Sequence, residues 1–342
     1  MVTAKRPLAR PPRTLAAVGE FGFLDLIVPK VPLVRGTLVG PGQDCAVIRC
    51  GQRSYLFTID ALVAESHFRA AWLTPRQIGR KAFLINASDI AAMGGTPRFC
   101  VVAFGAPAAY LARDLRAVQR GIVEAAQSCG AAVVGGNLAR TRQLTVTVAL
   151  LGEAPPRIVT RQGACPGDHV FVTGTLGDAA LAVQALRAGD RPPAAALRRF
   201  REPQPRLQAG RFLATSGIAS AMIDVSDGLV QDLGHICEQS DVGATILVHQ
   251  VPRSAAYRTA RGPGDLLALH GGEDYELLFT VPDRHLPRLA RSARRLGCAV
   301  TRVGCITREG GVRLLDEHDR PLRLGRGGYD HFRMPTPSGK TG

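Results

Sequence analysis

The segment 224–229, Asp-Val-Ser-Asp-Gly-Leu, limits the possible folds of this chain more than any other stretch. It follows an apolar run at 218–223, which predicts a strand, and it precedes a helix-like run from 229. Two carboxylates this close repel each other unless a cation lies between them. Hard divalent ions with oxygen ligands are the usual solution. The segment therefore predicts a metal site where a strand meets a helix.

Four further groups of acidic residues lie beside Gly, Ser, Thr or Asn, at 42–45, 58–60, 86–89 and 271–275. One such group alone is more often a turn or a helix cap. Five groups in a chain of net charge +15 favour a site for several metal ions and a phosphate. Asn86 and Asp89 share a helix face flanked by apolar residues, so we expect a partly buried Asp89 that needs a partner.

Composition and net charge limit the classes of binding partner that this chain can have. The net charge of +15 is compatible with nucleic acid, a membrane surface or small anions. The basic residues are dispersed and aromatic residues make up only 5%, so base stacking is poorly supplied and we expect no nucleic-acid partner. No apolar run is long enough to span a membrane, so no membrane partner is expected. Eight cysteines without a C-x-x-C pair, and no signal-like start, predict a cytoplasmic protein.

Strands and helices alternate in both halves of the chain, which predicts α/β and α+β domains. We expect a disordered basic extension at 1–18, an α/β domain at 19–153, an α+β domain at 154–332 and a disordered tail at 333–342. The boundary lies in a Pro- and Gly-bearing stretch that starts at 154. The predicted helices are 76–93, 110–128, 179–188, 193–216, 229–240 and 284–296. The predicted strands are 53–60, 98–104, 131–134, 144–151, 169–173, 219–223, 244–249, 275–281 and 299–306.

The order of these groups resembles a known family. Asp60 is followed by His67-Phe, then Asn-x-Ser-Asp89, Gly135-Gly, Asp224-x-Ser-Asp-Gly, Gly-Gly-Glu273-Asp-Tyr and finally Gly-Tyr-Asp-His-Phe332. The set resembles the thiamine-monophosphate kinase family, in the aminoimidazole ribonucleotide synthetase superfamily. The resemblance runs from about residue 19 to residue 332, nearly the whole chain.

The resemblance implies a two-domain aminoimidazole ribonucleotide synthetase-like fold, in homodimers whose N-terminal sheets pair in a barrel. It also implies that ATP is the co-substrate and that several Mg²⁺ ions hold it in the N-terminal ATP- and metal-binding domain. The implied reaction is ATP-dependent phosphorylation of thiamine monophosphate to thiamine diphosphate by direct in-line transfer. The acceptor phosphate is already ionised at neutral pH, so no strong general base is required.

The resemblance also assigns residues to roles. The implied metal ligands are Asp44, Thr58, Asp60, Asp89, Asp224 and Asp227, of which Asp89, Asp224 and Asp227 are catalytic. The implied ATP-binding residues are Gly136, Asn137, Arg161 and Ser226. The residues implied to lie next to the thiamine phosphate are His67, Glu273 and Tyr329.

Three positions depart from the usual pattern of the family. Gln43 stands where an Asp is usual, Ile59 where a Thr is usual, and Asn137 where an Asp is usual. These departures keep two alternatives open. One is a paralogous ATP-dependent enzyme that acts on another small molecule, and the other is a non-catalytic nucleotide-binding protein.

Overall fold

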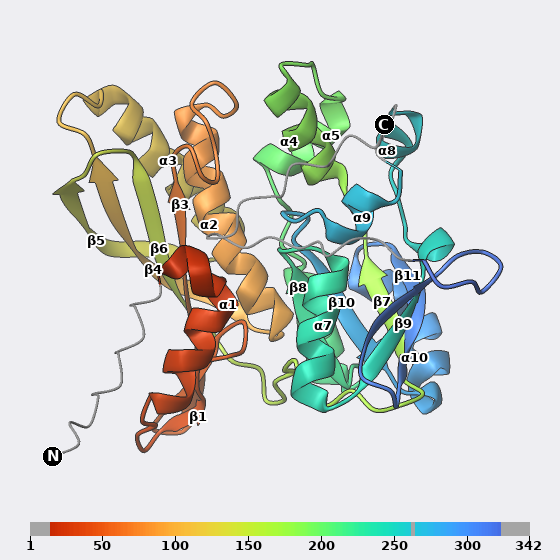
Figure 1. The fold of residues 1–342 in the computed structure, drawn as a ribbon. Coiled ribbons are helices and arrows are strands. Elements are labelled where there is room, and N and C mark those ends of the chain that lie inside the picture. Colours follow the sequence, from red (N-terminus) through yellow and green to blue (C-terminus); the bar gives the residue numbers. More distant parts are fainter. Residues whose placement is uncertain (1–13, 261–263, 323–342) are drawn as a thin grey trace, which may run out of the picture.

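Two six-stranded sheets, one from each half of the chain, lie side by side in the molecule (Figure 1). The computed structural model describes residues 14–260 and 264–322. Helix α2 (Pro75–Ala92) lies between the two sheets and contacts strands of both. The helix therefore joins the N-terminal half of the molecule to the C-terminal half.

The N-terminal sheet has the strand order β1-β2-β3-β6-β4-β5. Its strands are β1 (Thr37–Val39), β2 (Ala46–Cys50), β3 (Arg53–Val63), β4 (Thr96–Ala106), β5 (Ala132–Arg140) and β6 (Thr145–Glu153). Neighbouring strands are antiparallel except β4 and β5, which are parallel. Helices α2 and α3 (Ala112–Ser128) pack tightly on each other, and α2 contacts β3, β6 and β4.

Helix α2 begins and ends where the sequence indicates. The side chain of Thr74 accepts a hydrogen bond from the backbone N–H of Gln77, and the Gln77 side chain accepts one from the backbone N–H of Thr74. This reciprocal pair is a capping box, which satisfies two N–H groups that the first turn leaves free. The helix stops before Gly94, whose φ of 75° is easily reached only by a residue without a Cβ.

The N-terminal sheet has one covered face and one uncovered face. On β3, Leu56 and Thr58 are buried, whereas Phe57 and Ile59 are 44% and 62% exposed. Successive side chains of a strand point to opposite faces, so the exposed pair lies on the face that points away from α2. This uncovered face is apolar.

The C-terminal sheet has the strand order β12-β9-β11-β7-β10-β8, and only β12 and β9 are parallel neighbours. Its strands are β7 (His169–Thr173), β8 (Ala221–Val225), β9 (Gly243–Leu247), β10 (Glu276–Val281), β11 (Val300–Thr307) and β12 (Gly311–Leu315). The helices of this half are α4 (Asp178–Ala188), α5 (Ala194–Arg201), α6 (Leu207–Ser216), α7 (Leu229–Ser240), α8 (Ala255–Thr259), α9 (Leu266–His270) and α10 (Leu286–Ser292). Every residue of β8 and β10 is buried.

The predicted two-domain mixture of strands and helices is confirmed, with differences in detail. Helix α1 (Leu15–Ile27) begins inside the stretch expected to be a disordered extension. Residues 1–13 and the expected tail at 333–342 lie outside the described residues. The helical run expected at 193–216 is two helices, because Pro203 and Pro205 interrupt it. In the described part of the chain, no helix has the length and apolar character needed to cross a membrane.

Candidate functional site

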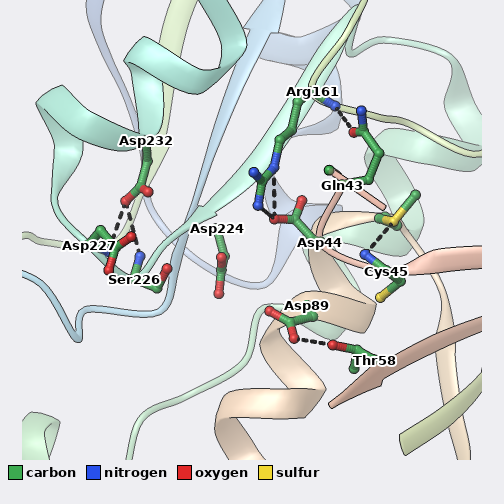
Figure 2. Close-up of polar contacts among 12 residues, drawn as sticks. Gln43, Asp44, Cys45, Thr58, Asp89, Arg161, Asp224, Ser226, Asp227 and Asp232 are labelled. Atoms are coloured by element: carbon green, nitrogen blue, oxygen red, sulfur yellow. Dashed lines mark hydrogen bonds and ion pairs between the residues drawn. The ribbon is translucent and has the colours of Figure 1, made fainter. Parts of the chain in front are cut away.

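Five aspartates from both halves of the chain gather where α2 meets β8 and the loop that follows it, and Figure 2 labels Asp44, Asp89, Asp224 and Asp227 among them. Asp60 comes from β3, Asp89 from the last turn of α2, and Asp44 from the loop before β2. Asp224 lies on β8, and Asp227 lies in the turn between β8 and α7. The carboxylates of the segment 224–229, where the sequence predicts a metal site, therefore lie beside carboxylates from three distant stretches of the chain.

Short hydrogen bonds orient two of these carboxylates. The Thr58 hydroxyl donates to Asp89 Oδ2 at 2.6 Å. The Ser88 hydroxyl donates to Asp224 Oδ2, also at 2.6 Å, and this bond links α2 directly to β8. Each donor leaves a second carboxylate oxygen for another ligand.

Arg161 pairs with a third carboxylate. Its Nη2 lies 2.6 Å from Asp44 Oδ1, and its Nε donates to the same oxygen at 3.2 Å. Asp44 Oδ2 is buried and has no hydrogen-bond partner among the described residues. The backbone N–H of Arg161 donates to the Gln43 side chain at 2.8 Å. Gln43 and Arg161 thus join the loop before β2 to the segment that links the two sheets.

The turn after β8 is held by a buried carboxylate. Asp232 Oδ2 accepts hydrogen bonds from the backbone N–H groups of Ser226, Asp227 and Gly228 at 3.1, 3.2 and 3.0 Å. Gly228 has φ 124°, a conformation that a residue with a Cβ rarely adopts. Three hydrogen bonds from within the chain therefore hold the turn that carries Ser226 and Asp227.

The aspartates repel one another and are buried, and both effects raise their pKa values. Burial, followed by the Coulombic effect of Asp227, raises the pKa of Asp60 to about 7. Burial and the neighbouring Asp44 raise the pKa of Asp224 to about 8. Burial and the charges of Asp60 and Asp224 hold the pKa of Asp89 well above its ordinary value. The cluster lacks enough positive charge of its own to keep all five carboxylates ionised.

The donor set fits hard divalent cations such as Mg²⁺. Its groups are carboxylates with a threonine hydroxyl, and oxygen ligands are what Mg²⁺ prefers. Two buried acceptors, Asp44 Oδ2 and Asn86 Oδ1, have no hydrogen-bond partner among the described residues. Buried acceptors without a donor are costly, and a cation would satisfy them.

Without divalent ions, the melting temperature should fall as the pH rises from about 4 to about 8. Asp60 and Asp224 have folded-state pKa values of about 7 and about 8, above the ordinary 3.8, so the folded protein binds more protons than the unfolded chain. Their stabilising contribution is complete below pH 3.8 and is lost as the pH passes through 7 and 8. Thermal denaturation in EDTA and in saturating Mg²⁺ measures this.

Mg²⁺ should remove most of this fall in melting temperature. In EDTA, Asp224→Asn should make the fall smaller, because unfolding then releases fewer protons. An equal pH dependence in EDTA and in Mg²⁺ would contradict a metal site at the cluster.

Glu273 lies beside the cluster, on the loop 271–275. Its backbone N–H donates to the carbonyl of Ser226 at 2.7 Å, and its carboxylate pairs with the buried Lys81 at 3.0 Å. His67 follows β3, and its Nδ1 accepts a hydrogen bond from the backbone N–H of Val63 at 3.0 Å. Tyr329 lies outside the described residues.

Gly136 and Asn137 do not join the cluster within one chain. They lie on the exposed edge strand β5, and the register runs from Asp60 through Val148 and Val102 to Gly136. Three strand spacings of about 4.8 Å separate them from Asp60, roughly 14 Å in all.

The structure shows the surroundings of Gln43 and Ile59, two of the positions that depart from the family pattern. Gln43 hydrogen-bonds to the Gln239 side chain and to the backbone of Arg161, so it bridges the two halves. Ile59 is exposed on the uncovered face of the sheet, opposite to Thr58 and the aspartates. The residue at position 59 thus points away from the cluster.

The sequence analysis missed three polar residues that shape the site: Lys81, Ser88 and Asp232. Lys81 and Ser88 stand in an otherwise apolar helix face and are completely buried. Asp232 is in the first turn of α7, where a carboxylate can accept from free N–H groups. For Lys81, the sequence signal was a charged residue among the apolar residues of a predicted helix.

This fold and this site define a class of protein. The model of the AIR synthase related protein N-terminal domain matches residues 42–154, and the model of the C-terminal domain matches residues 165–317. The two matches contain both sheets almost completely, together with all five aspartates.

The chain belongs to the thiamine-monophosphate kinase family, which confirms the resemblance. It is 39% identical over 284 residues to the thiamine-monophosphate kinase of Mycobacterium tuberculosis (strain ATCC 25618 / H37Rv), covering 81% of this chain and 85% of the relative. It is 34% identical over 329 residues to that of Escherichia coli (strain K12), covering 93% and 100%. The solved structure of AaThiL complexed with AMPPCP and TMP matches at a TM-score of 0.81 and 29% identity, covering 94% of this chain and all of that one.

Proposed function

We propose that this protein transfers the γ-phosphoryl group of ATP to thiamine monophosphate and forms thiamine diphosphate. Family membership supports this reaction, and so does the similarity to a structure complexed with AMPPCP and TMP. The observation that carries the proposal is the cluster of five aspartates, contributed by both halves of the chain. Phosphoryl transfer between two anions requires such a site, because catalysis consists mainly of positioning and charge neutralisation.

In this proposal the metal ligands are Asp44, Asp60, Asp89, Asp224 and Asp227, with the Thr58 hydroxyl beside Asp89. When bound, Mg²⁺ ions would neutralise the phosphate oxygens and hold donor and acceptor in line. The residues of the chain do the positioning. Ser88 orients Asp224, and Asp232 holds the backbone turn that carries Ser226 and Asp227.

The cluster holds carboxylates rather than a nucleophile beside a base, so we infer direct transfer without a phosphorylated enzyme. The acceptor phosphate is ionised at neutral pH and attacks without losing a proton. We assign Ser226, Arg161, Gly136 and Asn137 to ATP, and His67, Glu273 and Tyr329 to the acceptor.

Mass spectrometry of reactions with Mg-ATP and a panel of phosphorylated acceptors tests the function. We expect thiamine diphosphate as the product from thiamine monophosphate. Turnover of another acceptor in the panel, with thiamine monophosphate inert, would indicate the paralogous enzyme. ATP binding without any product would indicate a non-catalytic nucleotide-binding protein.

We also propose a homodimer joined through the uncovered face of the N-terminal sheet. Phe57 and Ile59 on β3, and Phe99 and Val101 on β4, are all at least 44% exposed there. An apolar patch of this kind on a sheet marks an interaction surface. Asn137 is in register with the exposed Ala103 on β4, so it lies on the same face. A second copy would therefore reach the Gly136–Asn137 strand, which lies apart from the cluster within one chain.

Ile59→Lys should convert the dimer to monomers, since it places a charge at the centre of the apolar face. Size-exclusion chromatography with light scattering measures the mass. Gln52→Lys is the matched control, because it adds the same charge on an exposed turn next to β3. Equal masses for wild type and Ile59→Lys would contradict this interface.

We place the domain boundary between 153 and 154, at the end of β6 and in the segment that leads to Arg161. A cytoplasmic location is proposed from the cysteines, all eight of which are free thiols.

A further inference from the structure

Lys81 is a buried charged residue beside the site that the proposed reaction does not use. It lies in the middle of α2, and its side chain is completely buried. Its Nζ lies 3.0 Å from Glu273 Oε1 and 3.9 Å from the centre of the Phe200 ring. Burial lowers the pKa of Lys81, and the charge of Glu273 opposes that shift. A buried ammonium group is rare unless it has a purpose or a partner, and its partner here belongs to the other half of the chain.

The partner sits in a strained loop. Glu273 has φ 70° and Tyr275 has φ 51°, a left-handed conformation that residues with a Cβ rarely adopt. Strain of this kind persists only where the surroundings hold it, and it concentrates at ligand sites. The backbone N–H groups of Glu273 and Tyr275 donate to the carbonyls of Ser226 and Val225 at 2.7 and 2.8 Å. The loop is thus fastened to the segment that carries Asp224 and Asp227.

Helix α2 therefore contacts the C-terminal half of the site at two points on one helix face. Lys81 and Ser88 are seven residues apart, which is two turns of a helix. Ser88 donates to Asp224, and Lys81 pairs with Glu273. The first contact sets the metal side of the site, and the second lies at the loop assigned to the acceptor.

We propose that Lys81 is a positioning residue for the acceptor: its ammonium group fixes the carboxylate of Glu273 and holds the loop 271–275 in its strained conformation. The proposal rests on the proposed function, in which Glu273 faces the acceptor. Glu273 Oε1 is taken by Lys81, whereas Oε2 has no hydrogen-bond partner among the described residues. The Glu273 side chain is 25% exposed, so this oxygen is available to a cationic or amino-bearing acceptor such as thiamine monophosphate.

Lys81→Met tests the proposal, because it removes the charge and keeps the length of the side chain. We expect kcat/KM for thiamine monophosphate to fall about 10²-fold, the loss expected when a group is displaced by about 1 Å. KM for Mg-ATP should stay within about twofold, since ATP-binding groups keep their geometry. A role in folding alone would change both substrates together.

An activity-independent readout follows the loop itself. Hydrogen exchange measured by mass spectrometry should become faster in Lys81→Met for the peptide that contains Glu273 and Tyr275. Ile122→Ala is the control for general destabilisation, because Ile122 is fully buried in α3, whereas the loop 271–275 belongs to the C-terminal half of the chain. It should lower the melting temperature without a selective effect on the acceptor or on the loop.

The double variant Lys81→Met with Glu273→Gln covers the case in which Lys81→Met folds poorly. It leaves no unpaired buried charge, so it should melt at a higher temperature than either single variant. It should still bind the acceptor weakly.

Equal losses for ATP and acceptor in Lys81→Met, or loop exchange no faster than in Ile122→Ala, would overturn the proposal. Failure of the proposed function looks different: the wild type then forms no thiamine diphosphate. In that case the exchange experiment alone decides whether Lys81 holds the loop.

Discussion

Asp224→Asn should lower kcat by ~10²-fold or more, the loss expected when a preorganised charge at a phosphoryl-transfer site is removed. The substitution keeps the shape of the side chain, and the Asn carbonyl can still accept the Ser88 hydrogen bond. Asp89→Asn should have a similar effect, because Asp89 faces the same cluster from α2. Steady-state kinetics with saturating Mg-ATP measures the loss.

Both variants should remain folded, and their melting temperatures in EDTA should equal or exceed that of the wild type. The reason is that each removes one charge from a group of carboxylates that repel one another. Asp241→Asn is the matched control, since Asp241 is exposed at the end of α7 with φ 52°, which Asn tolerates. Near-normal kcat in Asp224→Asn and Asp89→Asn would reject the proposed site.

Glu276→Gln should destabilise the protein by about 3–5 kcal/mol, the cost of leaving a buried charge without its partner. The Glu276 side chain is 1% exposed and pairs with Arg206, which is 13% exposed. The Thr173 hydroxyl also donates to Glu276 Oε2 at 2.6 Å, so the carboxylate joins β10, β7 and the start of α6. Urea denaturation measures the change in the free energy of unfolding.

Glu153→Gln is the matched control for this loss. Glu153 pairs with Arg98 at 2.6 Å, but both side chains are more than a third exposed. An exposed ion pair contributes only about 0–1 kcal/mol, so this variant should be close to wild type. Equal losses in the two variants would show that burial does not set the strength of the Glu276 pair.

The local pattern of the chain was enough to predict the elements that carry the site. The helix at 76–93, the strand before Asp224 and the helix after Gly228 are all present, within a few residues of the expected bounds. Their caps and apolar periodicity are local signals, and local signals are readable from sequence. The strands β1, β2 and β12, which are three to five residues long, were not predicted.

The motif order likewise predicted which carboxylates gather. Asp44, Asp60, Asp89, Asp224 and Asp227 do lie together, and their mutual effects on pKa reflect that proximity. Gly136 and Asn137 carry an equally recognisable motif, yet within one chain they lie three strands away on an exposed edge. The motif order therefore did not predict that Gly136 and Asn137 lie apart from the aspartates within one chain.

By itself the sequence determined the family, the two-domain α/β character and the set of acidic residues that gather, because each depends on residue types at fixed spacings. Only the tertiary structure decided how charge is balanced around that set. Arg161 neutralises Asp44, Asp232 holds the turn of Asp227, and Lys81 reaches Glu273 across 192 positions of the chain. Electrostatic partners are selected by distance and burial in space, and neither quantity follows from the spacing of residues along the chain.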